Sequence, residues 1–339
     1  MPQAAPERTL PTPQEQILRI VTNHWQGRCV GVAAQLEVAD HLADGPLHVD
    51  VLAQRTETHA PSLYRVLRAL ESTGIFTQTS PRVFANTPQS DCLRRHKPGS
   101  QWAWVRMCLC SDSFHQDGWG SLLLAVKNGK PGYRQARGQS TWEFLQSNPE
   151  QHTIFNGAMR DLSASMTPAV TASYDWSKFP VIADIGGGIG SQLSSILDAH
   201  PSVHGILFDR HSVVAEAPAH SRMERVSGDF FTEVPVQADA YVMRWVLHDW
   251  GDDEAATILR NVRKSAPPGA RVMLIEWVIP ETAEFDSGKW MDINMLVHHT
   301  GRERTASEFR SLYEQAGFEL VDIIATPSPL CIVVGKLRD

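Results

Sequence analysis

The sequence predicts an α/β protein with a mainly helical N-terminal half and a C-terminal half built on a mostly parallel sheet covered by helices on both faces. Up to about residue 175, apolar residues recur at helical spacing, as in Leu63, Val66, Leu67 and Leu70. Beyond residue 175, short apolar strands alternate with helical segments, which is typical of a parallel sheet. The first of these strands leads into a glycine-rich turn that opens a helix, as in nucleotide-binding folds.

Within the helical half, residues 47–91 have the order of a winged helix. A short helix over Val51–Arg55, a turn at Pro61 and Ser62 and a helix ending near Thr73 precede two extended pieces, 75–78 and 82–86. Winged helices often bind DNA. The second helix here presents only Arg65 and Arg68 outward, offset by Glu71, so a module for dimerisation and for covering a substrate is the better interpretation.

The composition excludes several classes of partner. Lys and Arg total 31 against 38 Asp and Glu, which gives a formal charge of -7 and no electrostatic footprint for nucleic acid or an anionic membrane. We find neither a secretory signal nor eighteen consecutive apolar residues. The five cysteines are an odd number without CxxC pairs, so they indicate neither a disulfide framework nor a zinc site. We therefore expect a cytoplasmic protein with a small-molecule partner.

The predicted strands of the C-terminal half mark where a ligand should bind. They cover 181–185, 203–209, 238–246 and 270–278, followed by a helix near 305–316 and a final pair of strands to the C-terminus. Ligands of such sheets lie beyond the carboxyl ends of the parallel strands, so the turns after these strands are the places to examine.

The turn after the first strand is rich in glycine. Asp184 is followed by Ile185 and by Gly186, Gly187 and Gly188, with a further glycine at position 190. One or two glycines would be enough for a tight turn, whereas four in five positions favour close approach of a nucleotide-type ligand. When the dinucleotide pattern GxGxxG is aligned from Gly186, its last glycine position is occupied by Ser191. This difference argues against a pyrophosphate ligand.

Two further acidic positions fit an adenosine ligand. Asp209 ends the next strand, where a carboxylate can bind both ribose hydroxyls. Asp229 and Phe230 follow a short strand, where a carboxylate can accept from the adenine amine and an aromatic ring can cover the base. A plain turn would explain the second pair equally well, and it is the order of the three features that favours adenosine.

His248 lies at the exit of the fourth strand, beside the predicted cofactor site. A lone histidine is more often structural than catalytic. Two carboxylates change this interpretation: Glu276 interrupts an apolar run at the end of a strand, and Glu303 precedes the next helix. A glutamate in buried surroundings needs a partner or a function, because unpaired burial of a charge is costly.

From about residue 15 onward, the sequence resembles the plant-type small-molecule O-methyltransferases and, more closely, their bacterial natural-product relatives such as anthracycline O-methyltransferases. The segments that carry the resemblance are FNGAM, DIGGGIG with Asp209, GDFF, RWVLHDW, the glutamate of LIEWVIPE and GRERTASEF. The resemblance implies a Rossmann-like class I methyltransferase domain with a seven-stranded sheet, S-adenosylmethionine as cofactor, S-adenosylhomocysteine as product, and a homodimer formed through the N-terminal domain.

The resemblance also assigns roles to residues. His248 matches the family's base, and Glu276 and Glu303 match the pair that flanks and orients it. Asp209 matches the ribose ligand, Asp229 and Phe230 match adenine contacts, Met159 matches a residue near the reacting methyl group, and Arg244 replaces a lysine common in the plant enzymes. We expect a disordered tail over 1–13, the winged-helix dimerisation domain over 14–98, a helical linker lining the substrate pocket over 99–172, and the S-adenosylmethionine-binding domain over 173–339.

The expected reaction is transfer of a methyl group to a phenolic hydroxyl, because the expected pocket residues suit a flat aromatic or polycyclic acceptor. An imidazole with an ordinary pKa near 6.5 is largely neutral at cytoplasmic pH and can take the hydroxyl proton, and no metal is required. Asp252 and Asp253 begin a helix, where a helix-dipole or capping role is expected rather than metal binding. The expected acceptor contacts are Trp102, Met107, Phe155, Asp249, Met291, Asn294, Met295 and His299.

The sequence is also compatible with three other functions. The first is N-methylation of a heteroaromatic metabolite, which would need no strong base. The second is a family member that binds S-adenosylmethionine but catalyses different chemistry. The third is a transcriptional regulator with a ligand-sensing domain.

Overall fold

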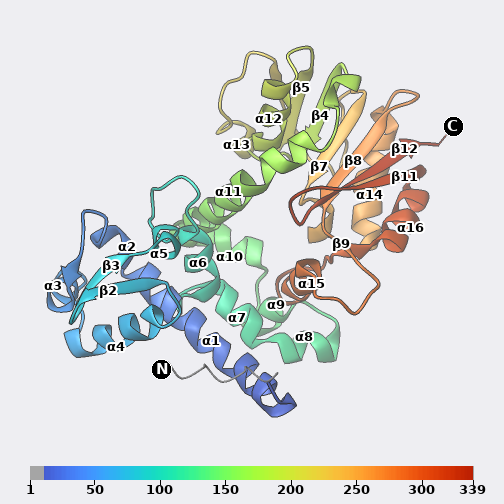
Figure 1. Cartoon of the computed structure of the whole chain (residues 1–339). Coiled ribbons are helices and arrows are strands. Elements are labelled where there is room, and N and C mark those ends of the chain that lie inside the picture. The colour runs from blue at the N-terminus through green and yellow to red at the C-terminus, as the bar shows by residue number, and fades with distance from the viewer. Residues whose placement is uncertain (1–10, 339) are drawn as a thin grey trace, which may run out of the picture. The chain divides into compact units, whose positions relative to one another are not determined.

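A computed structural model describes residues 11–338, and these divide into two compact units (Figure 1). The first unit comprises the described residues up to Gln116 together with Thr153–Asp161, and the second comprises Asp117–His152 together with the chain from Leu162. Most of the tail expected over residues 1–13 lies outside the described residues. The first helix, α1, begins at Pro13 and is capped by the side chain of Thr12.

The first unit is mainly helical and contains a small antiparallel sheet with strand order β1-β3-β2. Its core consists of Leu and Val residues of α3 and α4 around Phe76 and Phe84. The predicted order of two helices and two strands is present, but Pro61 and Ser62 lie in the first turn of α4 rather than in a preceding turn. The elements are α1 (Pro13–Gln35), α2 (Val38–His41), β1 (Leu47–His48), α3 (Val49–Arg55), α4 (Ala60–Glu71), β2 (Phe76–Ser80), β3 (Val83–Asn86), α5 (Pro88–Asp91) and α6 (Trp102–Leu109).

The middle of the chain is helical, and its residues belong alternately to one unit and the other. The helices α7 and α11 each contribute residues to both. Short helices with glycine or asparagine at their ends separate them. The segment 99–172, expected as one helical linker, is divided between the two units. Their bounds are α7 (Phe114–Gly120), α8 (Leu122–Asn128), α9 (Gly132–Arg137), α10 (Thr141–Ser147), α11 (Pro149–Ala172) and η1 (Trp176–Lys178).

The second unit is built on a seven-stranded sheet with the order β11-β12-β8-β7-β4-β5-β6. Strand β12 runs antiparallel to both of its neighbours, and the pairs from β8 to β6 are all parallel. The strands are β4 (Val181–Ile185), β5 (His204–Asp209), β6 (Met223–Ser227), β7 (Ala240–Arg244), β8 (Arg271–Glu276), β11 (Phe318–Ala325) and β12 (Cys331–Leu337). The sheet of the predicted α/β half is therefore confirmed.

Two apolar layers cover the sheet, because its strands are apolar on both faces. One layer packs the strands against α14 (Asp252–Ser265) and α16 (Ala306–Ala316), and the other packs them against α12 (Ser191–Ala199) and the end of α11. The remaining elements are α13 (His211–Val214), η2 (Leu247–Asp249), β9 (Val278–Ile279), α15 (Ser287–His298) and β10 (Arg304–Thr305), with β9 and β10 paired in parallel. Among the described residues, no helix combines the length and the apolar character needed to cross a lipid bilayer.

Candidate active site

The glycine loop joins β4 to α12 at the point where the sheet order reverses. Gly186, Gly188 and Gly190 have φ values of 69°, 61° and 78°, which residues with side chains rarely adopt. A Cβ atom on Gly187 would lie 2.5 Å from Cγ of Asp184. The loop therefore requires its glycines, and at Gly188 no atom lies within 4 Å of the position of a Cβ, which leaves the backbone there open to a ligand.

Asp209, at the end of β5, is hydrogen bonded to this loop. Its Oδ2 accepts from the backbone N–H of Gly188 at 2.9 Å, and its Oδ1 accepts from the N–H of Arg210 at 2.7 Å. Burial raises the pKa of this carboxyl group, although both bonds act in the opposite direction. As the sequence predicted, the acidic residue at the end of the second strand lies beside the glycine loop.

Asp184 and Arg244 are buried charges beside the loop. Burial raises the pKa of Asp184 to about 7 and lowers that of Arg244 to about 10, and their mutual attraction opposes both shifts. Arg244 donates to Oγ1 of Thr167 at 2.5 Å, to Oε1 of Gln192 at 3.1 Å and to the carbonyl of Ser163 at 3.3 Å. Most of its donors thus bind α11 and α12, so any contribution of Arg244 to cofactor binding is mainly electrostatic.

The loop after β6 gathers aromatic rings at the same edge of the sheet. Phe230 packs edge to face on Phe231 and on Trp250, with ring centroids 5.0 and 6.3 Å away. Asp229 is exposed, and its Oδ1 accepts from the N–H of Phe231 at 2.9 Å. Trp250 was not among the predicted site residues, although it belongs to the same RWVLHDW segment as His248.

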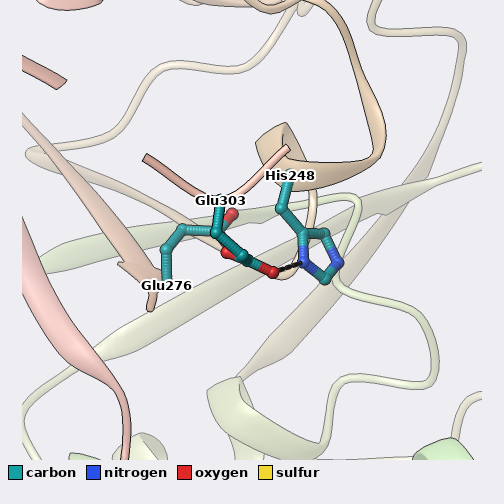
Figure 2. A group of neighbouring side chains, drawn as sticks. All are labelled: His248, Glu276 and Glu303. Carbon is teal, nitrogen blue, oxygen red and sulfur yellow. Dashed lines mark hydrogen bonds and ion pairs between the residues drawn. The ribbon is translucent and has the colours of Figure 1, made fainter. Parts of the chain in front are cut away.

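His248 lies on the short helix η2 and is held by Glu303 from the segment before α16. Nδ1 of the imidazole is 2.8 Å from Oε1 of Glu303, and Figure 2 shows the carboxylate pointing at the ring. The side chains of His248 and Glu303 are 11% and 0% exposed. A proton on Nδ1 is therefore directed to Glu303, which leaves Nε2 as the ring atom available to a substrate.

Glu276, at the end of β8, supports the backbone that carries His248. Its Oε1 accepts from the N–H groups of Val246 and Leu247, both at 3.2 Å. The preceding residue, Trp245, has a φ of 53°, which is unusual for a bulky side chain and marks strain in this turn. Glu276 thus orients His248 through the main chain, whereas Glu303 contacts the imidazole itself.

Arg304 binds the carbonyl groups of the same turn, and the sequence analysis did not predict it as a site residue. Its guanidinium is 1% exposed and donates to the carbonyls of Leu247 and Trp250, both at 3.0 Å. It is held in turn by Oδ1 of Asp252, at 2.9 and 3.0 Å. Asp252 lies in the first turn of α14, next to the N-cap Gly251, so it combines a helix-dipole position with this ion pair.

The three acidic groups around His248 change its protonation. Burial alone lowers the pKa of the imidazole, but the neighbouring carboxylates outweigh this effect and raise the pKa to about 10. Burial also raises the pKa of Glu276 to about 7. The carboxylates around the ring therefore favour the protonated form of His248, an effect that the ordinary pKa assumed from the sequence does not include.

The donor atoms of His248, Glu276 and Glu303 lie within 4.8 Å of one another. One imidazole and two carboxylates at this spacing match the ligand types of several divalent metals. Oε1 of each glutamate bonds the imidazole or the backbone that carries it, whereas both Oε2 atoms are buried with no hydrogen-bond partner among the described residues. The Oε1 bonds suit a histidine that exchanges protons.

The residues predicted to contact an acceptor belong to both units. Trp102, Met107 and Phe155 lie in the first unit, as does Met159, the residue expected near the reacting methyl group. The indole N–H of Trp102 donates to the carbonyl of Ala34 at 2.9 Å, a contact typical of a core residue.

The other five lie in the second unit, and two groups among them are brought together. Asn294 accepts from the indole N–H of Trp119 at 3.1 Å and lies 3.7 Å from the sulfur of Met291, one turn earlier on α15, and Met295 is buried next to it. Asp249 and His299 lie next to each other beside His248, with 3.9 Å between Asp249 Oδ1 and His299 Nε2.

The sheet order with one reversed strand, the glycine loop after β4 and an acidic residue at the end of β5 define a Rossmann-like class I methyltransferase fold. Residues 119–319 match the O-methyltransferase domain, and residues 18–95 match the O-methyltransferase dimerisation domain. The chain belongs to this family of S-adenosylmethionine-dependent O-methyltransferases.

Three relatives illustrate the range of chemistry in the family. The phenazine O-methyltransferase PhzM of Lysobacter antibioticus is 37% identical over 94% of this chain and 95% of its own length. The crystal structure of NcsB1, an O-methyltransferase of neocarzinostatin biosynthesis in complex with S-adenosylmethionine and 2-hydroxy-5-methyl naphthoic acid, is 32% identical, covers 94% of this chain and 98% of that one, and has a TM-score of 0.80. The 8-amino-8-demethylriboflavin N,N-dimethyltransferase of Streptomyces davaonensis is 33% identical over 86% of each chain.

Proposed function

We propose that this enzyme transfers the methyl group of S-adenosylmethionine to a phenolic hydroxyl of an aromatic or polycyclic small molecule in secondary metabolism, with His248 as the general base. The observation that carries the proposal is the buried pair of His248 and Glu303 at the edge of the sheet that also holds the glycine loop. The named relatives act on phenazine and naphthoate compounds, which supports an aromatic acceptor.

The loop residues fit an adenosyl cofactor. No atom lies within 4 Å of the Cβ position of Gly188, so the loop backbone is open to a ligand there, and Asp209 presents a carboxylate beside the loop that suits two ribose hydroxyls. Phe230 and Trp250 supply apolar ring surface for adenine, and Asp229 supplies an acceptor for its amine. Bound S-adenosylmethionine supplies an electrophilic methyl group on a sulfonium.

The residues of this chain then position the acceptor and move one proton. The deprotonated form of His248 accepts the hydroxyl proton at Nε2 as the acceptor oxygen attacks, and the negative charge of Glu303 stabilises the imidazolium that forms. Glu276 and Arg304 hold the turn that carries the ring, so that little reorganisation accompanies the transfer. We propose that no metal takes part, since methyl transfer from a sulfonium to oxygen needs alignment of the acceptor and removal of one proton, and His248 can accept that proton.

N-methylation is the second candidate, because one relative is an N,N-dimethyltransferase. An amine nitrogen attacks with its own lone pair, so it needs alignment more than a base. Incubation with methyl-labelled S-adenosylmethionine and paired hydroxy- and amino-naphthalenes, with and without a chelator, tests the proposal. Label on oxygen that is insensitive to chelation is expected. Label confined to nitrogen, or loss of activity on chelation, would contradict it.

We further propose a cytoplasmic homodimer that forms through the N-terminal unit. Helix α1 exposes large apolar side chains over more than half of their surface, and it overlaps the dimerisation domain: Ile17, Leu18, Ile20, Val21 and Trp25. The five cysteines form no disulfides among the described residues, as is common for proteins in a reducing compartment. Sedimentation equilibrium of the full chain tests the dimer, and a monomer at micromolar concentration would contradict it.

A further inference from the structure

A second carboxylate, on helix α15, holds the main chain of Glu303. Oδ1 of Asp292 accepts a hydrogen bond from the backbone N–H of Glu303 at 3.0 Å, across eleven positions of the chain. Asp292 is partly buried, and Glu303 is buried. A backbone N–H in buried surroundings is costly without an acceptor, so this bond fixes the peptide from which the Glu303 side chain extends. Asp292 thus acts on the residue that orients His248.

The segment that contains Glu303 packs against the turn that carries His248. A Cβ atom on Gly301 would collide with the backbone carbonyl oxygen of His248, so the two main chains are in direct contact. Further along the segment, Glu303 bonds the imidazole and Arg304 bonds carbonyls of the same turn. Because these contacts are close, a displaced Glu303 peptide would change the distance between its carboxylate and the ring. The bond to Asp292 restrains that displacement.

The acceptor oxygen of Asp292, rather than its charge, is the feature that serves Glu303. Burial raises the pKa of Asp292, and the hydrogen bond from the N–H of Glu303 lowers it. The negative charges of Glu303 and Glu308 also raise this pKa, whereas the positive charge of Arg302 lowers it. A second negative charge beside Glu303 is unfavourable by itself. Asparagine has the same acceptor oxygen without the charge, so it should replace Asp292 in this role.

Helix α15 also carries three of the residues expected to contact the acceptor: Met291, Asn294 and Met295. Met291 directly precedes Asp292, and Asn294 follows within one turn. Backbone hydrogen bonds join successive turns of a helix, so neighbouring residues on it move together. A displacement of α15 by a bound acceptor therefore reaches Glu303 through the bond to Asp292.

We propose that Asp292 is a positioning residue for methyl transfer: by accepting the N–H of Glu303, it holds the Glu303 carboxylate at the imidazole of His248 and links this pair to α15. The inference rests on the proposed O-methylation with His248 as base. Loss of the bond weakens the contact between Glu303 and His248 without removing the carboxylate. Asp292→Ala should therefore resemble Glu303→Gln in the direction of its effect and be smaller in size.

The dependence of kcat/KM on pH tests the proposal, with labelled S-adenosylmethionine and 2-naphthol as acceptor. In Asp292→Ala, the acid limb should move to lower pH and the plateau should fall by about 2- to 10-fold, the range expected for one hydrogen bond. Asp292→Asn should keep the wild-type profile. When Glu303 is already replaced by Gln, Asp292→Ala should cause no further shift, because it acts only through the lost carboxylate. A further shift in that double variant would overturn the proposal.

Asp286→Ala is the matched control, because Oδ1 of Asp286 accepts the N–H of Gly288 at 2.7 Å at the start of the same helix. This variant should keep the wild-type pH profile. A shift equal to that of Asp292→Ala, or an Asp292→Asn profile that follows Asp292→Ala, would overturn the positioning role. Failure of Asp292→Ala to fold, or to bind S-adenosylhomocysteine in calorimetry, would also overturn it, since Asp292 would then serve the fold as a whole.

The pKa of His248 gives a second measurement that needs no acceptor. NMR of protein with nitrogen-labelled histidine should show a lower pKa in Asp292→Ala than in wild type, and a lower one still in Glu303→Gln. An unchanged pKa in Asp292→Ala together with a lower one in Glu303→Gln would overturn this inference and leave the proposed base pair intact. An unchanged pKa in both would overturn both. The NMR result decides the role of Asp292 even where 2-naphthol is not methylated, so failure of the proposed reaction is seen separately.

Discussion

Oε1 of Glu303 and Nδ1 of His248 are 2.8 Å apart, and the carboxylate of this pair has no solvent-exposed side-chain surface. The two residues are 55 positions apart in the sequence and meet because the turn after β7 and the segment before α16 lie at the same edge of the sheet. Burial lowers the pKa of His248, and the neighbouring carboxylates raise it above its ordinary value. The pair thus determines both which ring nitrogen faces the substrate and how strongly it holds a proton.

Replacing Glu303 by Gln should lower the rate and shift its pH dependence. The pKa of His248, raised to about 10 by its surroundings, falls when the nearest negative charge is removed. The base must be deprotonated to act, so the acid limb of the kcat/KM profile should move to lower pH, while the plateau falls by about 10- to 100-fold because the imidazolium is less stabilised. A pH profile identical to that of wild type would contradict the pairing.

Replacing Glu276 by Gln should change how stability depends on pH. The folded-state pKa of Glu276 is about 7, above its ordinary value of 4.5, so the folded protein binds this proton more tightly than the unfolded chain does. Stability from this group is present below pH 4.5 and is lost as the pH rises through 7. Urea unfolding would give the free energy of unfolding at pH 5 and at pH 8. Its decrease between these two pH values should be about 1 to 3 kcal/mol smaller in Glu276→Gln than in wild type.

Glu284 offers a control for the Glu276 substitution, because its side chain is exposed. Glu284→Gln should lose stability between pH 5 and pH 8 as wild type does. The same loss in Glu276→Gln as in wild type would show that the buried carboxyl group does not carry the effect.

Replacing Arg304 by Lys should reduce turnover more than cofactor affinity. A single ammonium group cannot reach the carbonyls of Leu247 and Trp250 together with Asp252, so the turn that carries His248 loses support. We expect kcat to fall about tenfold and the free energy of unfolding to fall by about 2 to 4 kcal/mol. Arg302→Lys is the matched control, since Arg302 is 44% exposed. Equal effects in both variants would argue against a positioning role for Arg304.

Replacing Asp209 by Ala should weaken binding of S-adenosylmethionine. The carboxylate is the proposed ribose ligand, and its bond to the N–H of Gly188 also holds the glycine loop. Calorimetry should show at least about a tenfold increase in Kd, as expected when hydrogen bonds to a charged group are lost. Asp198→Ala on α12, where the carboxylate is 76% exposed, should bind as wild type does. Unchanged affinity in Asp209→Ala would place the ribose elsewhere.

The sequence was sufficient to predict the parallel sheet and the edge where the site lies, because both depend on local patterns of apolar residues and glycine. It predicted β7 as residues 238–246, whereas the strand ends at Arg244. Trp245 adopts a φ of 53°, which breaks the strand pattern and begins the turn that presents His248. An apolar run does not reveal such strain, since the main-chain conformation is imposed by contacts with Glu276 and Arg304.

Arg304 shows the limit of reasoning from local sequence. It stands in the polar run Gly301–Thr305, which is typical of an exposed loop, yet its guanidinium is 1% exposed. Its partners Leu247 and Trp250 are more than fifty residues earlier, so only the pairing of distant elements reveals the contact. The raised pKa of His248 escaped prediction for the same reason, because it depends on three carboxylates converging in space.

The most direct test of the account is the rate of methyl transfer to oxygen in His248→Asn. With a phenolic acceptor and labelled S-adenosylmethionine, kcat/KM should fall by about 10²- to 10⁴-fold, because the proton acceptor is lost, while calorimetric affinity for the cofactor stays unchanged. His204→Gln, an exposed histidine at the start of β5, should retain wild-type activity. Near-wild-type O-methylation by His248→Asn would contradict the assignment of His248 as the base.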